Sequence, residues 1–97
     1  MKKETLYSYV VIFSGTSVEN VTTTINKMSH DIPNWMTVLP QTVFMVSPHN
    51  AKKLSSILRK STDVDRLLVL DAKTDRNGWL PSNSWEFLSN PKYVGQR

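Results

Sequence analysis

The sequence predicts a single α+β domain in which a four-stranded antiparallel sheet carries two helices on one face. Three observations support this prediction: the order of strand-like and helix-like segments, the short chain, and strands that are apolar on both faces. The chain has 97 residues, a length typical of one domain. We expect this domain to span residues 1–97, with its core over about 6–72 and a C-terminal extension over 73–97. No linker, internal repeat or low-complexity segment divides it.

The first strand is expected over residues 6–13, where apolar side chains occupy both alternating sets of positions. One set consists of Tyr7, Tyr9, Val11 and Phe13, and the other of Ser8, Val10 and Ile12. Segments 42–46 and 66–70 are apolar in the same way. Because such strands have no polar face, both sides of the sheet should be covered, and two helices can cover only one side.

Two helices are expected from capping signals and apolar periodicity. The segment Thr16-Ser17-Val18-Glu19 has the pattern of a capping box, so the first helix should begin there. Its buried stripe would consist of Val18, Val21, Ile25 and Met28. The second helix should follow Ser47-Pro48, an N-cap and a proline at the first helical position. Its apolar face would consist of Ala51, Leu54, Ile57 and Leu58.

The remaining strands complete a recognisable order of elements. Residues 35–39 and 42–46 flank Pro40-Gln41 and predict a hairpin, and residues 66–71 predict a fourth strand. The order strand, helix, strand, strand, helix, strand is the split βαβ arrangement of ferredoxin-like domains, which places both helices on one face. Residues 74–83 are rich in turn-forming residues, and a short third helix is expected near residues 84–88.

Composition limits the class of protein. Twelve Lys and Arg and eight Asp and Glu give a net charge of +4, which favours polyanions but lies well below that of a dedicated histone-like protein. No apolar run approaches the roughly 18 residues that span a bilayer, and no cleavage site follows the basic start of the chain. The absence of cysteine excludes disulfides and thiolate metal sites. We therefore expect a cytoplasmic protein with no membrane partner.

The second helix carries the most suggestive charged residues. At about 100° per residue, four cations lie opposite its apolar face and form one stripe. These residues are Lys52, Lys53, Arg59 and Lys60. Contact with phosphates, docking on an acidic protein and an ordinary solvated helix face remain alternative interpretations of this stripe.

The uncovered face of the sheet predicts a homodimer. An apolar patch on this face would be unusual for a soluble monomer, so we expect it to form the dimer interface. Its residues would be Tyr7, Tyr9, Val11 and Phe13. A base-stacking platform like that of RNA-recognition modules is the alternative, although the third strand lacks their basic-glycine-aromatic pattern. Trp79 and Trp85 are expected to pack against the sheet or a partner.

Residues with catalytic or metal-binding chemistry are sparse. The acid cluster of Asp63, Asp65, Asp71 and Asp75 lacks the glycine and final glutamate of a calcium loop, and favours turns. His30 and His49 are not part of a nucleophile pattern. The segment 14–17 lacks the lysine of a P-loop, although it precedes a helix N-terminus, which is a weak signal for phosphate. We expect no catalytic residue, metal ligand or cofactor.

Residues 6–80 resemble the small CRISPR adaptation nuclease family, and in particular its short stand-alone relatives outside CRISPR loci. The resemblance rests on Trp35 ahead of the strand Gln41–Val46, on Asp65–Leu70 and on Gly78-Trp79-Leu80. It implies a homodimer whose sheets face one another. Family nucleases carry an aspartate at the end of the first strand, where carboxylates of two protomers hold a divalent ion. Here that segment reads Phe13-Ser14-Gly15-Thr16, without a carboxylate.

Two functions are compatible with these features. The first is a non-catalytic homodimeric binding module, of phage or mobile-element origin, that engages a nucleic-acid complex or a protein of a defence system. The second is a metal-dependent endonuclease of the resembled family with a displaced metal site at Asp71 or Asp75. The missing acid on the first strand favours the binding module.

Overall fold

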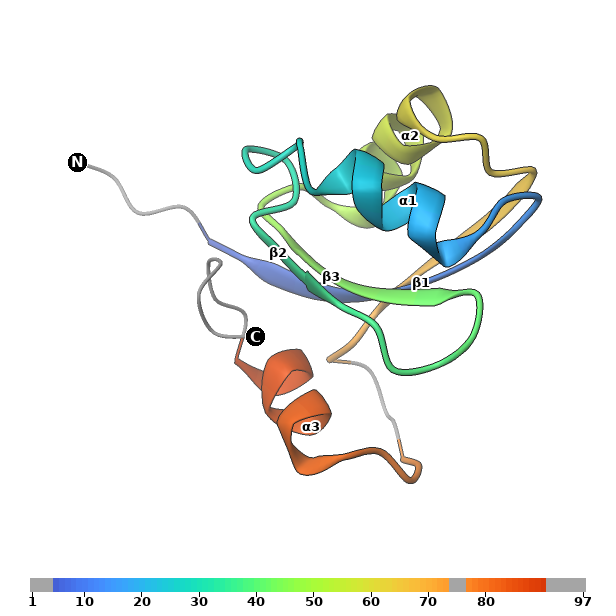
Figure 1. The fold of residues 1–97 in the computed structure, drawn as a ribbon. Helices are drawn as coiled ribbons and strands as arrows, with labels where there is room; N and C mark the ends of the chain where they lie inside the picture. Colours follow the sequence, from blue (N-terminus) through green and yellow to red (C-terminus); the bar gives the residue numbers. More distant parts are fainter. Residues whose placement is uncertain (1–4, 74–76, 91–97) are drawn as a thin grey trace.

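The computed structural model describes residues 5–73 and 77–90. Within these segments the chain forms four strands and three helices, and the strands make one antiparallel sheet. They are β1 (Tyr7–Ser14), α1 (Val18–Ile25), β2 (Asn34–Met36), β3 (Thr42–Ser47), α2 (Ala51–Ser61), β4 (Arg66–Asp71) and α3 (Ser82–Ser89). The strand order is β2-β3-β1-β4, and α1 and α2 lie together on one face of the sheet (Figure 1). The predicted ferredoxin-like α+β fold is confirmed.

Helices α1 and α2 both begin later than the sequence predicts. Ser17 rather than Thr16 is the N-cap of α1. Asn50 rather than Ser47 caps α2, because its side-chain oxygen accepts a hydrogen bond from the Lys53 N–H at 2.8 Å. Ser47 still belongs to β3. In both cases the cap is the residue three positions before the amide that donates the hydrogen bond, as the geometry of the first helical turn requires.

Outside the hairpin, the strands agree with the predicted bounds to within one residue. β4 spans residues 66–71 as predicted. β2 is shorter than predicted and ends at Met36. The connection to β3 includes Gln41, whose φ is 52°, and whose side-chain amide donates to the carbonyl of Phe13 at 3.3 Å. This contact fastens the hairpin to the end of β1.

The main core lies between the sheet and the pair α1 and α2. It contains Tyr9, Val11 and Phe13 of β1 together with Val21 and Ile25 of α1 and Leu54 and Leu58 of α2. The prediction that Tyr9, Val11 and Phe13 form a dimer interface on the helix-free face is therefore wrong, because each is at most 4% exposed beneath the helices. Tyr7, at the start of the strand, is 39% exposed.

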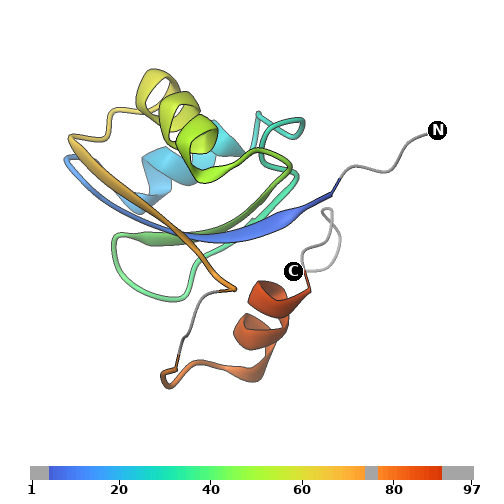
Figure 2. The same ribbon diagram turned by 180° about the vertical axis from the view of Figure 1, so that it is seen from behind.

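Helix α3 lies on the face of the sheet opposite α1 and α2 (Figure 2), and a second, smaller core lies between it and the sheet. Phe87 and Leu88 of α3 pack there against Phe44 and Val46 of β3. The Ser8 hydroxyl on β1 donates to the Phe87 carbonyl at 3.3 Å. The expected additional cover of this face is thus supplied in part by the C-terminal extension.

The cover of the second face is incomplete. Ile12 of β1 is 40% exposed, and Leu68 and Leu70 of β4 are 52% and 44% exposed. The register places Ile12 opposite Leu68 and Val10 opposite Leu70, so these side chains share the face that α3 covers only in part. We call Ile12, Leu68 and Leu70 the open apolar patch.

Candidate binding surfaces

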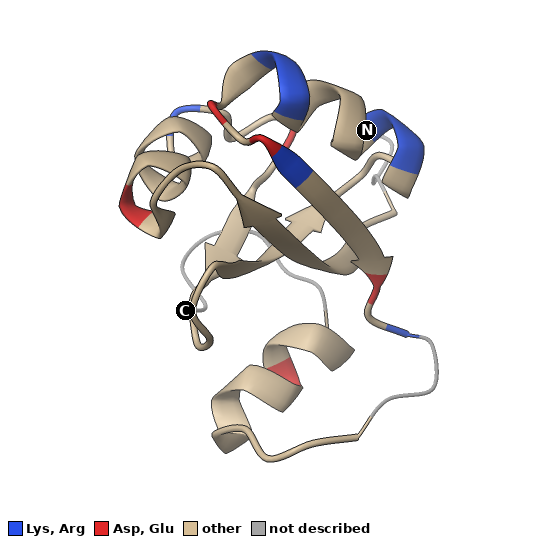
Figure 3. Cartoon of the chain, turned by 90° about the vertical axis from the view of Figure 1, so that its right-hand side faces the viewer, with Lys and Arg blue, Asp and Glu red and all other residues tan. Residues whose placement is uncertain are grey.

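The outer face of α2 presents the four predicted cations to solvent. Leu54 and Leu58 are fully buried beneath the helix, which turns Lys52, Lys53, Arg59 and Lys60 outward, and all four are exposed. Figure 3 shows Lys and Arg gathered on this helix. The predicted orientation of the basic stripe is confirmed, because the apolar period of the helix fixes which side faces the sheet.

Part of this basic face is hollowed. Lys52, Arg59 and Lys60 line an open hollow of about 450 Å³ together with the hydroxyl-bearing residues Ser55 and Ser56. Lysine, arginine and serine side chains all donate hydrogen bonds to phosphate oxygens. The sequence pattern did not single out the two serines, because their positions between the cations become visible only on the helix surface.

The cations of α2 have no acid partners within the part of the chain that the structure describes. The helix contains no Asp or Glu, and in the described segments the close contact between a basic and an acidic side chain joins His49 to Asp31 instead. An ordinary solvated helix face usually mixes acids with bases at a spacing of three or four residues. The α2 face is therefore a concentrated positive surface.

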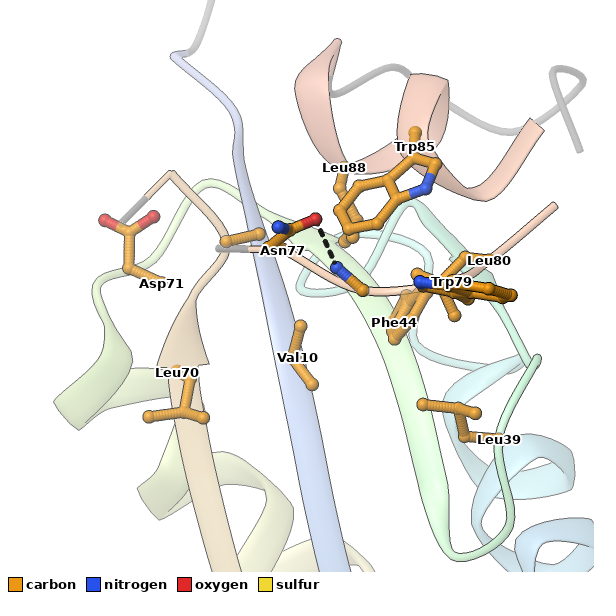
Figure 4. A pocket seen from close by; sticks show the side chains of 12 residues that line it. Val10, Leu39, Phe44, Leu70, Asp71, Asn77, Trp79, Leu80, Trp85 and Leu88 are labelled. Atoms are coloured by element: carbon orange, nitrogen blue, oxygen red, sulfur yellow. Dashed lines mark hydrogen bonds between the residues drawn. The ribbon is translucent and has the colours of Figure 1, made fainter. Parts of the chain in front are cut away.

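A second candidate surface is an apolar pocket of about 420 Å³ between the sheet and the C-terminal extension. Figure 4 shows Val10, Phe44, Leu70, Leu80, Trp85 and Leu88 around it. Trp85 packs against the second core as predicted, whereas the Trp79 side chain is 99% exposed at the pocket. Local sequence does not reveal this pocket, because strands β1, β3 and β4 meet the extension only in the folded chain.

Tyr9, His49 and Asp31 form a chain of polar contacts near the start of α2. The Tyr9 hydroxyl donates to the His49 carbonyl at 2.7 Å, and the His49 ring nitrogen Nε2 lies 2.8 Å from Asp31 Oδ1. Burial, and then the nearby charge of Asp71 and the neighbouring Tyr7, raise the pKa of Tyr9. These contacts tie β1 to the loop before β2 and to the start of α2, which is a structural role.

The described acids do not assemble a metal centre. Among residues 5–73 and 77–90, no group of three or more His, Cys, Asp or Glu is placed to hold a metal ion. Asp71 Oδ1 accepts a hydrogen bond from the Lys73 N–H at 2.9 Å, as a turn residue does. Asp75, the other acid of the predicted displaced site, lies outside the described residues. Asp63 and Asp65 precede β4, and both are exposed.

The comparisons do not assign the chain to a family. No protein-family model, curated protein or solved structure matches it. The resemblance to the CRISPR adaptation nuclease family therefore stays a prediction from sequence. Within the described part of the chain, no helix is both long and apolar enough to cross a membrane.

Proposed function

We propose that this protein is a non-catalytic module that binds the phosphate backbone of nucleic acid through the outer face of α2. The observation that carries the proposal is the cluster of four exposed cations that have no acid partner among the described residues, three of them around a hollow that Ser55 and Ser56 also line. Within this proposal the module acts in the cytoplasm, as its composition led us to expect, on nucleic acid of a defence or mobile-element complex.

The chemistry of this face predicts how binding behaves. Contacts to phosphates neutralise backbone charge and release counterions, so affinity falls steeply with salt and does not depend on base sequence. If all four cations contact phosphates, the slope of log K against log salt is about −3.6 for duplex DNA. Raising salt from about 50 to 200 mM then weakens binding roughly 150-fold.

Fluorescence anisotropy with a labelled DNA duplex tests the proposal. We expect the variant Lys52→Gln/Lys60→Gln to lower the slope to about −1.8, so that the same change in salt weakens binding only about 12-fold. Glutamine suits a helix nearly as well as lysine, so folding should persist. Lys27→Gln, which removes a cation that lies outside α2, is the matched control and should leave the slope unchanged.

Two results would overturn the proposal. The first is absence of duplex and single-strand binding at low salt while polyglutamate binds through Lys52 and Lys60, which would identify an acidic protein as the partner. The second is cleavage of nucleic acid that requires Mg²⁺ or Mn²⁺ and disappears in Asp71→Ala, which would establish the nuclease instead.

A further inference from the structure

In the part of the chain that the structure describes, β4 forms one edge of the sheet, and the hydrogen-bond register defines which of its groups face outward. The Ala72 N–H donates to the Ser8 carbonyl at 3.0 Å, and the antiparallel register continues this pairing along β1 and β4. Alternate residues of an antiparallel strand bond the neighbour. Even-numbered residues of β4 therefore bond β1, and Leu67 and Val69 direct their N–H and C=O groups to the edge.

The same strand also exposes apolar side chains. Leu68 and Leu70 belong to the open apolar patch and are 52% and 44% exposed. An edge strand with outward hydrogen-bonding groups and exposed apolar side chains is a template for pairing with another strand. Natural edges usually avoid this by carrying lysine, proline or a bulge, and the interior of β4, residues 67–70, contains no lysine or proline.

We propose that two copies of this chain join by antiparallel pairing of their β4 strands, with Val69 on the two-fold axis. The two four-stranded sheets then form one continuous sheet. In this register Leu68 of each copy lies opposite Leu70 of the other. The two exposed leucines of each copy, four in the dimer, then cover one another. Such cross-strand apolar pairs are the unit of sheet stabilisation.

Charge selects this register over one of the two registers that are a single step away. The outward groups also meet if Leu67 lies opposite Val69, with Leu68 on the axis. That competitor brings Asp65 of one copy opposite Asp71 of the other, and two carboxylates in that position repel. The register centred on Val69 instead brings Asp65, which directly precedes β4 of one copy, to the end where Lys73 follows β4 of the other copy, and these two charges attract. All three charged residues are exposed.

The proposed dimer goes beyond nucleic-acid binding and does not depend on it. A two-fold axis perpendicular to the sheet keeps the helices of both copies on the same side. Because α2 packs on β4, the two basic faces lie on that side, near the axis. The open apolar patches of the two copies join on the opposite side.

Cross-linking tests both the dimer and its register. The chain contains no cysteine, so a single introduced thiol can bond only its counterpart. Opposed residues of a hydrogen-bonded pair have Cα atoms about 5.5 Å apart, within the range of a disulfide. We expect Val69→Cys to give a covalent dimer of twice 11.1 kDa on mild oxidation, and Leu68→Cys to remain monomeric in denaturing gels. Cross-linking of Leu68→Cys in place of Val69→Cys would overturn the register.

A charge exchange provides a test that does not need oxidation. Asp65→Lys alone and Lys73→Asp alone should each raise the dissociation constant in sedimentation equilibrium about tenfold, because each creates two like-charge pairs. The double exchange should restore wild-type affinity. Within one copy the two positions lie at opposite ends of β4, roughly 20 Å or more apart, so restoration requires contact between copies.

The outcomes separate this proposal from the proposed function. Circular dichroism establishes that each variant is folded before its mass is measured. A wild-type chain that sediments as a folded monomer at all concentrations overturns the dimer, whatever its affinity for DNA. Loss of DNA binding with an intact Val69→Cys cross-link overturns the proposed function and leaves the dimer standing.

Discussion

Val11 and Ile12 are neighbours on β1 whose side chains point to opposite faces of the sheet, so the same substitution at each position compares the cover of the two faces. Val11 is 1% exposed beneath α1 and α2, whereas Ile12 is 40% exposed on the other face. We expect Val11→Glu to unfold the domain and Ile12→Glu to leave it folded.

The expected difference in stability between the two variants is comparable to the lower range of stabilities of domains of this size. Val11→Glu loses about 2 kcal/mol of apolar burial and adds about 3–5 kcal/mol for a buried carboxylate without a partner. The free energy of unfolding of a domain of this length is roughly 5–15 kcal/mol. Ile12→Glu places a charge that stays in water and removes only the partial burial of the isoleucine side chain. We therefore expect it to lower the free energy of unfolding by about 1 kcal/mol.

Urea denaturation followed by circular dichroism measures both variants, at concentrations where the wild-type chain is monomeric. With a slope of about 1–3 kcal/mol per molar urea, Val11→Glu should lower the midpoint by about 2 M or more, or abolish the cooperative transition. Ile12→Glu should shift it by less than about 1 M. Equal destabilisation, or greater loss at Ile12, would refute the assignment of the main core to the face that carries Val11.

Two further substitutions probe local contacts. Because burial and then the charge of Asp71 raise the pKa of Tyr9, its contribution to stability is complete below about pH 10 and is lost as pH rises further, when the unfolded chain ionises first. Tyr9→Phe should reduce this alkaline loss in urea titrations and cost about 1–2 kcal/mol at neutral pH, since the bond to the His49 carbonyl disappears; an unchanged alkaline loss would contradict the cause. Gly15 has a φ of 95° and a Cβ there would overlap Asp65, so Gly15→Ala should lower the free energy of unfolding by about 2 kcal/mol or more, and a neutral effect in thermal denaturation would count against this close approach.

The local part of the fold is predictable from sequence. Each strand and helix is predicted from the periodicity of its own segment, and these predictions together give the order of elements. The bounds of β4 and the outward direction of Lys52 and Arg59 follow from local periodicity in the same way. A helix with Leu54 and Leu58 on one side has only one way to face a sheet, so the position of its cations is determined before packing begins. The candidate nucleic-acid surface could be named for this reason.

The buried face of β1 required the tertiary structure. Both alternating sets of its side chains are apolar, so no local preference distinguishes Val11 from Ile12, and exchanging the faces leaves the sequence pattern almost unchanged. Residues distant along the chain determine which set of side chains faces the main core. Helices α1 and α2 pack on one set, and on the other face the Ser8 hydroxyl donates a hydrogen bond to the Phe87 carbonyl of α3. The sequence by itself determined which segments form strands and helices and which helix face is basic. Only long-range packing decided which aromatic residues are core, how much of the second face α3 covers, and that the leucines of β4 remain exposed at an open edge.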